Sequence, residues 1–228
     1  MDMEVLDTFA DGTPYQSLAA SFLEFTRLTG NDPVLLVAEA AASTTGQNYV
    51  TGVQPTVERF REAFVETERC TSFVALTELD LEDEALLEAF GAQRKRHVFL
   101  EIADVLANRP ENSDFDALQS WAAEADAYRY ESDPVGSISG VGPSTFQYLR
   151  QLAGIDTAKP DPTLESLLEA VDEALQSSPI DTSEPLRMLA SCEWLALESS
   201  YSMLEIDRIA WWTFADERER SAVTDATE

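Results

Sequence analysis

Apolar residues recur every three or four positions along most of this chain, the spacing that puts them on one face of an α-helix. No segment of any length alternates apolar and polar residues as a half-buried strand does, and no repeat is visible. We therefore predict an all-α fold with short loops, and expect the tail from Asp216 to fray. The predicted helices cover residues 15–28, 33–42, 57–64, 81–90, 94–106, 114–128, 143–153, 162–175, 186–197 and 203–214.

The stretch Ile138–Arg150 departs from this regular pattern and organises the rest. Asp133 and Pro134 give an N-cap oxygen and a first-position proline, so they predict a short helix before it. Gly140 and Gly142 allow the backbone to reverse tightly, and Pro143 then opens a second helix that ends at Gly154. Backbone N–H groups at such a reversal and helix start are suited to binding a phosphate.

A carboxylate follows this reversal at a fixed distance. Asp161 lies seventeen positions after Ser144, between Pro160 and Pro162. Its simplest role is the N-cap of the helix over 162–175, with Pro162 at the first helical position. A helix N-terminus also keeps a carboxylate ionised, so Asp161 can serve both as a cap and as a charged group in a reaction.

The reversal and the spaced aspartate together resemble the helix-hairpin-helix superfamily of DNA glycosylases. The resemblance extends over residues 33–214 and is dense over 138–161. It implies one glycosylase-like unit, residues 1–228, made of two helical lobes with DNA in a cleft between them. One lobe would span 33–155 and end in the helix-hairpin-helix (133–154), and the other would combine 1–32 with 156–228.

The resemblance also implies roles for individual residues. Asp161 would stabilise the positive charge that develops on the sugar. Gln47, with Asn48 as second choice, would enter the duplex from a polar turn between two helices. Lys95, in the basic cluster 94–97, would contact a phosphate. The remaining DNA contacts would come from the hairpin: Gly140, Val141, Gly142, Ser144 and Thr145.

Each of these residues also has a purely structural interpretation. Gln47 and Asn48 suit a solvated turn between helices. Lys95 could belong to a solvated helix start. Cations at a helix start oppose the helix dipole, however, so the basic cluster there indicates a requirement other than helix stability. The aromatic residues Tyr49, Trp121 and Tyr148 are candidates for stacking on a base, and packing is the alternative for each.

Ser144 and the cysteines narrow the reaction type. Bifunctional members of the superfamily carry a lysine at the position of Ser144, and a serine cannot form the Schiff base that cleaves the strand. Lys159 lies outside that position. Cys70 and Cys192 are too few for an iron–sulfur cluster, and His97 is the only histidine. We expect no metal and no cofactor, leaving open only a monovalent cation at the hairpin.

The charge balance is strongly acidic: 43 Asp and Glu against 15 Lys and Arg, a formal net charge of −28. The acids are dispersed along the chain, and only two residues are lysine. Such a surface fits a high-salt cytoplasm, where the Debye length falls to ~3 Å and self-repulsion is screened. A basic or metal-rich partner is the alternative. No apolar run is long enough to span a membrane, so we expect a soluble, cytoplasmic monomer.

The sequence thus supports a cytosolic, monofunctional DNA glycosylase acting on double-stranded DNA as its first hypothesis. A catalytically inactive protein of the same fold, binding DNA or a protein partner, is the second. An acidic helical scaffold unrelated to DNA is the third. The base that is removed cannot be read from the sequence.

Overall fold

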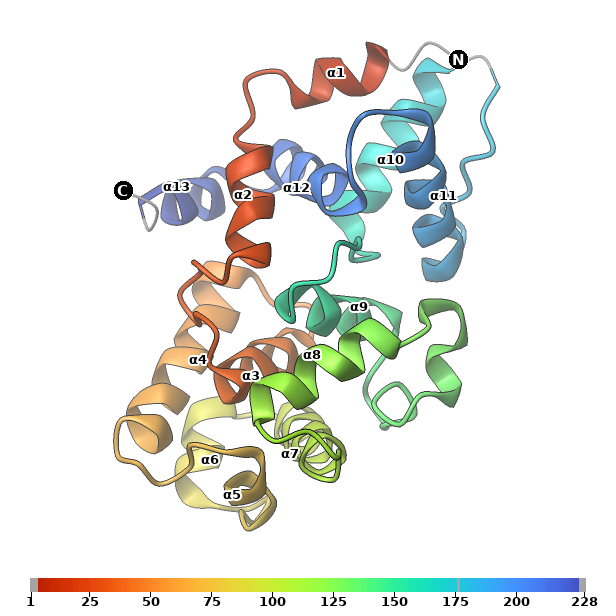
Figure 1. The fold of residues 1–228 in the computed structure, drawn as a ribbon. Coiled ribbons are helices and arrows are strands. Elements are labelled where there is room, and N and C mark those ends of the chain that lie inside the picture. Colours follow the sequence, from red (N-terminus) through yellow and green to blue (C-terminus); the bar gives the residue numbers. More distant parts are fainter. Residues whose placement is uncertain (1–3, 176, 226–228) are drawn as a thin grey trace.

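The computed structural model describes residues 4–175 and 177–225, and over these residues the chain forms helices, turns and loops without a strand (Figure 1). The prediction of an all-α fold is confirmed. None of the described helices combines the length and the apolar composition needed to cross a bilayer.

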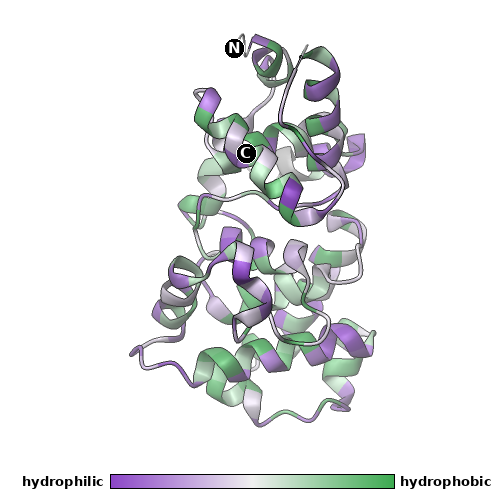
Figure 2. Ribbon diagram, turned by 90° about the vertical axis from the view of Figure 1, so that its right-hand side faces the viewer, coloured by the Kyte–Doolittle hydropathy of each residue, from purple (hydrophilic) through white to green (hydrophobic). Residues whose placement is uncertain are grey.

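Two groups of helices lie one above the other in Figure 1, and Figure 2 shows the same division after a quarter turn. The lower group comprises α3 (Pro33–Ser43), η1 (Tyr49–Val53), α4 (Gln54–Phe60), η2 (Arg61–Val65), α5 (Phe73–Thr77), α6 (Glu84–Phe90), α7 (Gln93–Ala107), α8 (Asp114–Glu124), η3 (Ala127–Ser132) and α9 (Pro143–Leu152). The upper group comprises α1 (Glu4–Ala10), α2 (Tyr15–Leu23), α10 (Pro162–Ala174), α11 (Pro185–Glu198), α12 (Met203–Phe214) and α13 (Glu217–Asp225).

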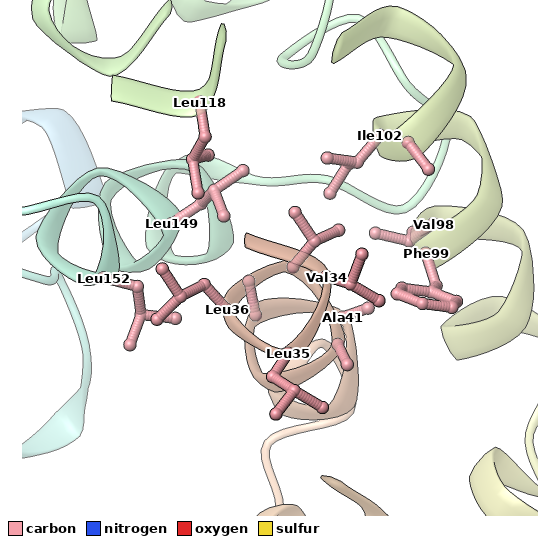
Figure 3. Close-up of a cluster of buried hydrophobic side chains, with 14 of the residues drawn as sticks. Val34, Leu35, Leu36, Ala41, Val98, Phe99, Ile102, Leu118, Leu149 and Leu152 are labelled. Carbon is pink, nitrogen blue, oxygen red and sulfur yellow. The ribbon is translucent and has the colours of Figure 1, made fainter. Parts of the chain in front are cut away.

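Helix α3 is the centre of the lower group. Asp32 caps it, accepting from the amides of Val34 and Leu35, and every residue from Val34 to Ala42 is buried. A helix that is apolar on all sides must be enclosed by others. Figure 3 shows this enclosure, with Leu149 of α9 on one side of α3 and Phe99 of α7 on the other.

The upper group has a separate hydrophobic core made from both ends of the chain. Leu6 of α1 packs with residues of α10, α11 and α12, among them Leu167, Leu195 and Ile209. Helix α2 joins the two groups, because it contacts both α12 and α9. Its residue Phe22 is buried with the core of the lower group.

The structure corrects the sequence predictions at several points. The helices α5, η1 and η3 were not predicted, and α2 and α8 end at Leu23 and Glu124 rather than at 28 and 128. The helix expected from Asp133 is only one turn: Asp133 caps the amides of Val135 and Gly136, but Gly136 lies directly against the carbonyl of Tyr130 and the turn does not continue. Helix α1 was not predicted. The tail from Asp216 does not fray at once, since the Asp216 carboxylate caps α13 by accepting from the amide of Glu219.

Candidate functional site between the two helical groups

The hairpin before α9 has the tight geometry that its glycines predict. Gly140 has a φ of +103°, and a Cβ there would lie 3.0 Å from Val98 Cγ2. The Arg94 guanidinium donates to the Gly140 carbonyl at 2.9 Å, which ties the hairpin to α7. Val141 is an exception to the prediction, because its amide already donates to the Ile138 carbonyl at 2.9 Å and cannot also hold a phosphate.

The start of α9 keeps free amides. Gly142 is its N-cap residue, and no described side chain caps this helix. The first-turn amides of Ser144 and Thr145 therefore have no helical partner. A Cβ placed on Gly142 would meet no atom within 4 Å, so open space lies in front of it.

A groove of about 450 Å³ runs along this helix start and reaches the predicted aspartate. Gly142, Ser144 and Thr145 line it, together with Lys159 and Asp161. A second cavity, of about 90 Å³, adjoins the groove. The two share Ser43, Gln47, Lys159 and Asp161. The structure thus brings together the hairpin, the aspartate and the glutamine that the sequence placed far apart.

Helices of both groups enclose the smaller cavity. Four aromatic rings line it, those of Phe22 (α2), Tyr49 (η1), Tyr148 (α9) and Trp211 (α12), together with the aliphatic Leu18 and Val53. Such rings can stack on a flat ligand. Trp121, also considered for stacking, is buried in the lower core and donates to Asp133 at 3.0 Å, so it packs instead.

Asp161 caps α10, as predicted, and also lines the groove and the cavity. Its Oδ1 accepts from the amides of Thr163 (3.0 Å) and Leu164 (3.2 Å) and from the Thr163 hydroxyl, so it caps α10. Its Oδ2 lies 3.4 Å from Lys159 Nζ. Burial alone would raise the pKa of Asp161, but Lys159, these hydrogen bonds and Arg208 together hold that pKa below its ordinary value. The carboxylate is therefore ionised at neutral pH and remains in contact with both the groove and the cavity.

The segment that carries Asp161 is anchored on both sides. The Gln147 and Gln151 side chains of α9 donate to the Thr157 hydroxyl and carbonyl, at 2.7 and 2.8 Å. The amide of Lys159 donates to Asp207 of α12 at 2.8 Å. These hydrogen bonds hold the segment to α9 on one side and to α12 on the other. They therefore fix where Asp161 lies relative to the hairpin.

A buried polar network that was not predicted from the sequence forms the floor of the cavity. The Glu39 carboxylate of α3, 1% exposed, pairs with Arg27 and accepts from the hydroxyls of Tyr148 (2.5 Å) and Thr29 (3.1 Å). Burial and Glu39 together raise the pKa of Tyr148 well above its ordinary value. The signal in the sequence was Glu39 itself, a single acid inside the apolar run 34–42.

Both lysines of the chain lie at this site. Lys159 Nζ is 4.6 Å from the centroid of the Tyr148 ring, and Lys95 Nζ donates to Gln47 Oε1 at 2.7 Å. Arg27 and Arg208 also line the cavity, and Arg94 lines the groove. In a chain with a net charge of −28, this is a local concentration of cations.

Asn48 lies beside Gln47 but makes different contacts. Its Nδ2 donates to Asp216 at 3.2 Å, and the next amide, of Tyr49, donates to Glu219 at 3.0 Å. The Asn48 side chain, the second choice for entering the duplex, therefore already donates to the residue that caps α13. Gln47 is the residue of this turn that lines the cavity and the groove.

The thiols contribute nothing to the site. Cys70 and Cys192 are both free and buried, one in each hydrophobic core. Burial raises the pKa of Cys192 well above its ordinary value, so this thiol is unreactive. Within 4–175 and 177–225, no three His, Cys, Asp or Glu side chains converge on a common point.

Comparison of the chain with protein-family models, with curated proteins and with solved structures found no match in any of the three.

Proposed function

We propose that this chain is a monofunctional DNA N-glycosylase built on a helix-hairpin-helix. One observation carries the proposal: an ionised carboxylate, Asp161, borders both the groove at the α9 amides and an aromatic cavity between the helical groups. A phosphate at the amides of Ser144 and Thr145 would hold the DNA backbone at the groove. A nucleotide turned out of the duplex would then place its base in the cavity.

The chemistry needs little more than this carboxylate. As the bond between sugar C1′ and the base nitrogen breaks, positive charge develops on the sugar, and Asp161 Oδ2 would stabilise it. The base leaves with the bonding electrons and takes up a proton from solvent, the oxygen of a water molecule bonds to C1′, and the water proton passes to solvent. Phe22, Tyr49 and Trp211 supply aromatic walls for the base.

The test is incubation of duplexes, each with one damaged or mismatched base, in molar KCl. We expect abasic sites that appear as strand breaks only after hot alkali, because Ser144 offers no amine at the hairpin. Borohydride should trap no covalent complex. Strand cleavage before alkali, with trapping that Lys159→Met abolishes, would contradict the monofunctional reaction and assign the amine to Lys159.

The same assay separates the alternatives. A duplex that binds without product on the whole panel indicates the inactive DNA-binding protein. No duplex binding at any salt concentration indicates a helical scaffold unrelated to DNA.

The hairpin glycines give a further prediction. Gly140→Ala should lower the free energy of unfolding by about 1–3 kcal/mol, because φ is +103° and the added Cβ would lie 3.0 Å from Val98 Cγ2. Gly142→Ala should change it by less than about 0.5 kcal/mol, since its Cβ faces open space. Yet that methyl group stands where a phosphate would approach, so duplex affinity should fall about tenfold. Urea unfolding and fluorescence anisotropy measure the two effects, and unchanged affinity in Gly142→Ala would contradict phosphate binding here.

A further inference from the structure

The Gln47 side chain is held from two sides. Lys95 Nζ donates to its Oε1 at 2.7 Å. On its other side, a Cβ on Gly52 would lie 2.7 Å from Gln47 Cβ and 2.8 Å from Oε1, so only glycine at position 52 leaves room for this conformation. Gln47 as a whole is exposed, but its Oε1 is held by Lys95 and its Cβ lies against Gly52 at the start of the η1 turn.

Lys95 determines which way the amide faces. An ammonium group donates hydrogen bonds and accepts none, so the atom opposite it must be the carbonyl oxygen Oε1. The two N–H groups on Nε2 then face elsewhere. No acceptor for Nε2 is found among the described residues, and Gln47 lines both the cavity and the groove.

Burial of the Lys95 ammonium group costs free energy, and its hydrogen bond to Gln47 is the contact that offsets part of this cost. The side chain is 2% exposed, and no carboxylate of the described chain lies within ion-pair distance of it. Burial and the nearby Arg59 both lower its pKa. Lys95 also lies in the first turn of α7, where the helix dipole opposes a cation. The one hydrogen bond of its Nζ within the described chain is to Gln47.

We infer that Lys95 is a positioning residue that makes Gln47 a donor-only contact in the cavity, selecting bases that present a carbonyl oxygen over bases that present an amino group at that point. The inference rests on the proposed function and names its substrate class. A carbonyl oxygen would accept from Nε2, whereas an exocyclic amine would meet another donor and leave both unpaired. The Phe22, Tyr148 and Trp211 rings enclose the same space and hold the base plane without reading its edge.

Hypoxanthine and adenine are matched probes, because they differ at C6 by an oxygen against an amine. Duplexes carry either base opposite an abasic analogue, so neither base is paired. The free bases are titrated in parallel against isotope-labelled chain, following the Gln47 side-chain amide by NMR. We expect about a tenfold preference for hypoxanthine in both experiments, the effect of one hydrogen bond.

Two variants separate positioning from simple contact. Gln47→Glu keeps the bond to Lys95 as an ion pair but presents only acceptors, so the preference should move toward adenine. Lys95→Met removes a buried charge and shortens the side chain by one atom, so the fold should persist while the free amide turns either way and the preference falls toward one. Circular dichroism confirms folding of both variants. Gln16→Glu, which makes the same change at an exposed glutamine of α2 that lines neither the groove nor the cavity, is the control and should keep the tenfold preference.

The two free bases also separate this inference from the proposed function. Absence of product and of duplex binding, with a shifted Gln47 amide in free hypoxanthine, would overturn the glycosylase but leave a carbonyl-selective base site. The same hypoxanthine-to-adenine ratio in the parent chain, Gln47→Glu and Lys95→Met would overturn the inference, and so would a Gln47 amide that neither free base shifts.

Discussion

Asp161→Asn should abolish base release while leaving the chain folded. The variant keeps the N-cap, because asparagine caps a helix as well as aspartate does. It removes the negative charge that would face the sugar. We expect the rate of abasic-site formation in molar KCl to fall by a factor on the order of 10² to 10³. Gel analysis after hot alkali measures it.

Glu169→Gln is the charge-matched control for this variant. Glu169 lies on the same helix α10, is exposed, and lines neither the groove nor the cavity. Both substitutions remove one negative charge, so a general electrostatic effect on DNA binding would appear in both. Equal activity of Asp161→Asn and the parent chain would contradict a catalytic role for Asp161 and leave it only the cap of α10.

Glu39→Ala should produce the largest loss of stability. It removes the acceptor of Arg27, Tyr148 and Thr29 at a position that is 1% exposed. Arg27 would then keep its charge without the carboxylate that pairs with it. Its Nε already lacks a hydrogen-bond acceptor among the described residues. Breaking a buried pair in this way typically costs about 3–5 kcal/mol. Urea unfolding in molar KCl measures the difference.

Two further variants calibrate this loss. Glu39→Gln keeps the shape and one acceptor oxygen, so its loss should lie between those of the parent chain and Glu39→Ala. Glu24→Ala removes an exposed acid at the end of α2 and should change stability by less than about 0.5 kcal/mol. A loss in Glu39→Ala no larger than in Glu24→Ala would show that the network does not stabilise the two groups of helices.

Helices with a clear apolar spacing and a strong start were predictable from the sequence. Met203–Phe214 was predicted with both ends correct, since Ser202 and Glu205 form a capping box before its apolar residues. Asp32 and Asp161, each followed by proline, likewise marked the starts of α3 and α10. Local chemistry determines these ends, so a single sequence is sufficient.

Contacts between distant segments were not predictable. Arg27 and Tyr148 are 121 positions apart, and the packing of α9 against α3 brings Tyr148 to the Glu39 carboxylate that pairs with Arg27. Helix α13 is polar, which is typical of a solvated tail, but Asp216 before it and Glu219 within it accept hydrogen bonds from Asn48 and Tyr49. The same holds for Lys95 and Gln47: the residue types suggested DNA contacts, but their mutual hydrogen bond depends on the tertiary fold.

We propose that the groove at the α9 amides and the cavity beside Asp161 together receive one nucleotide of a duplex. A crystal structure of Asp161→Asn bound to a duplex with a substrate base tests it most directly. We expect an unstacked nucleotide with its phosphate at Ser144 and Thr145 and its base between Phe22 and Trp211. A duplex bound on another face, with the cavity closed or holding only water, would contradict it.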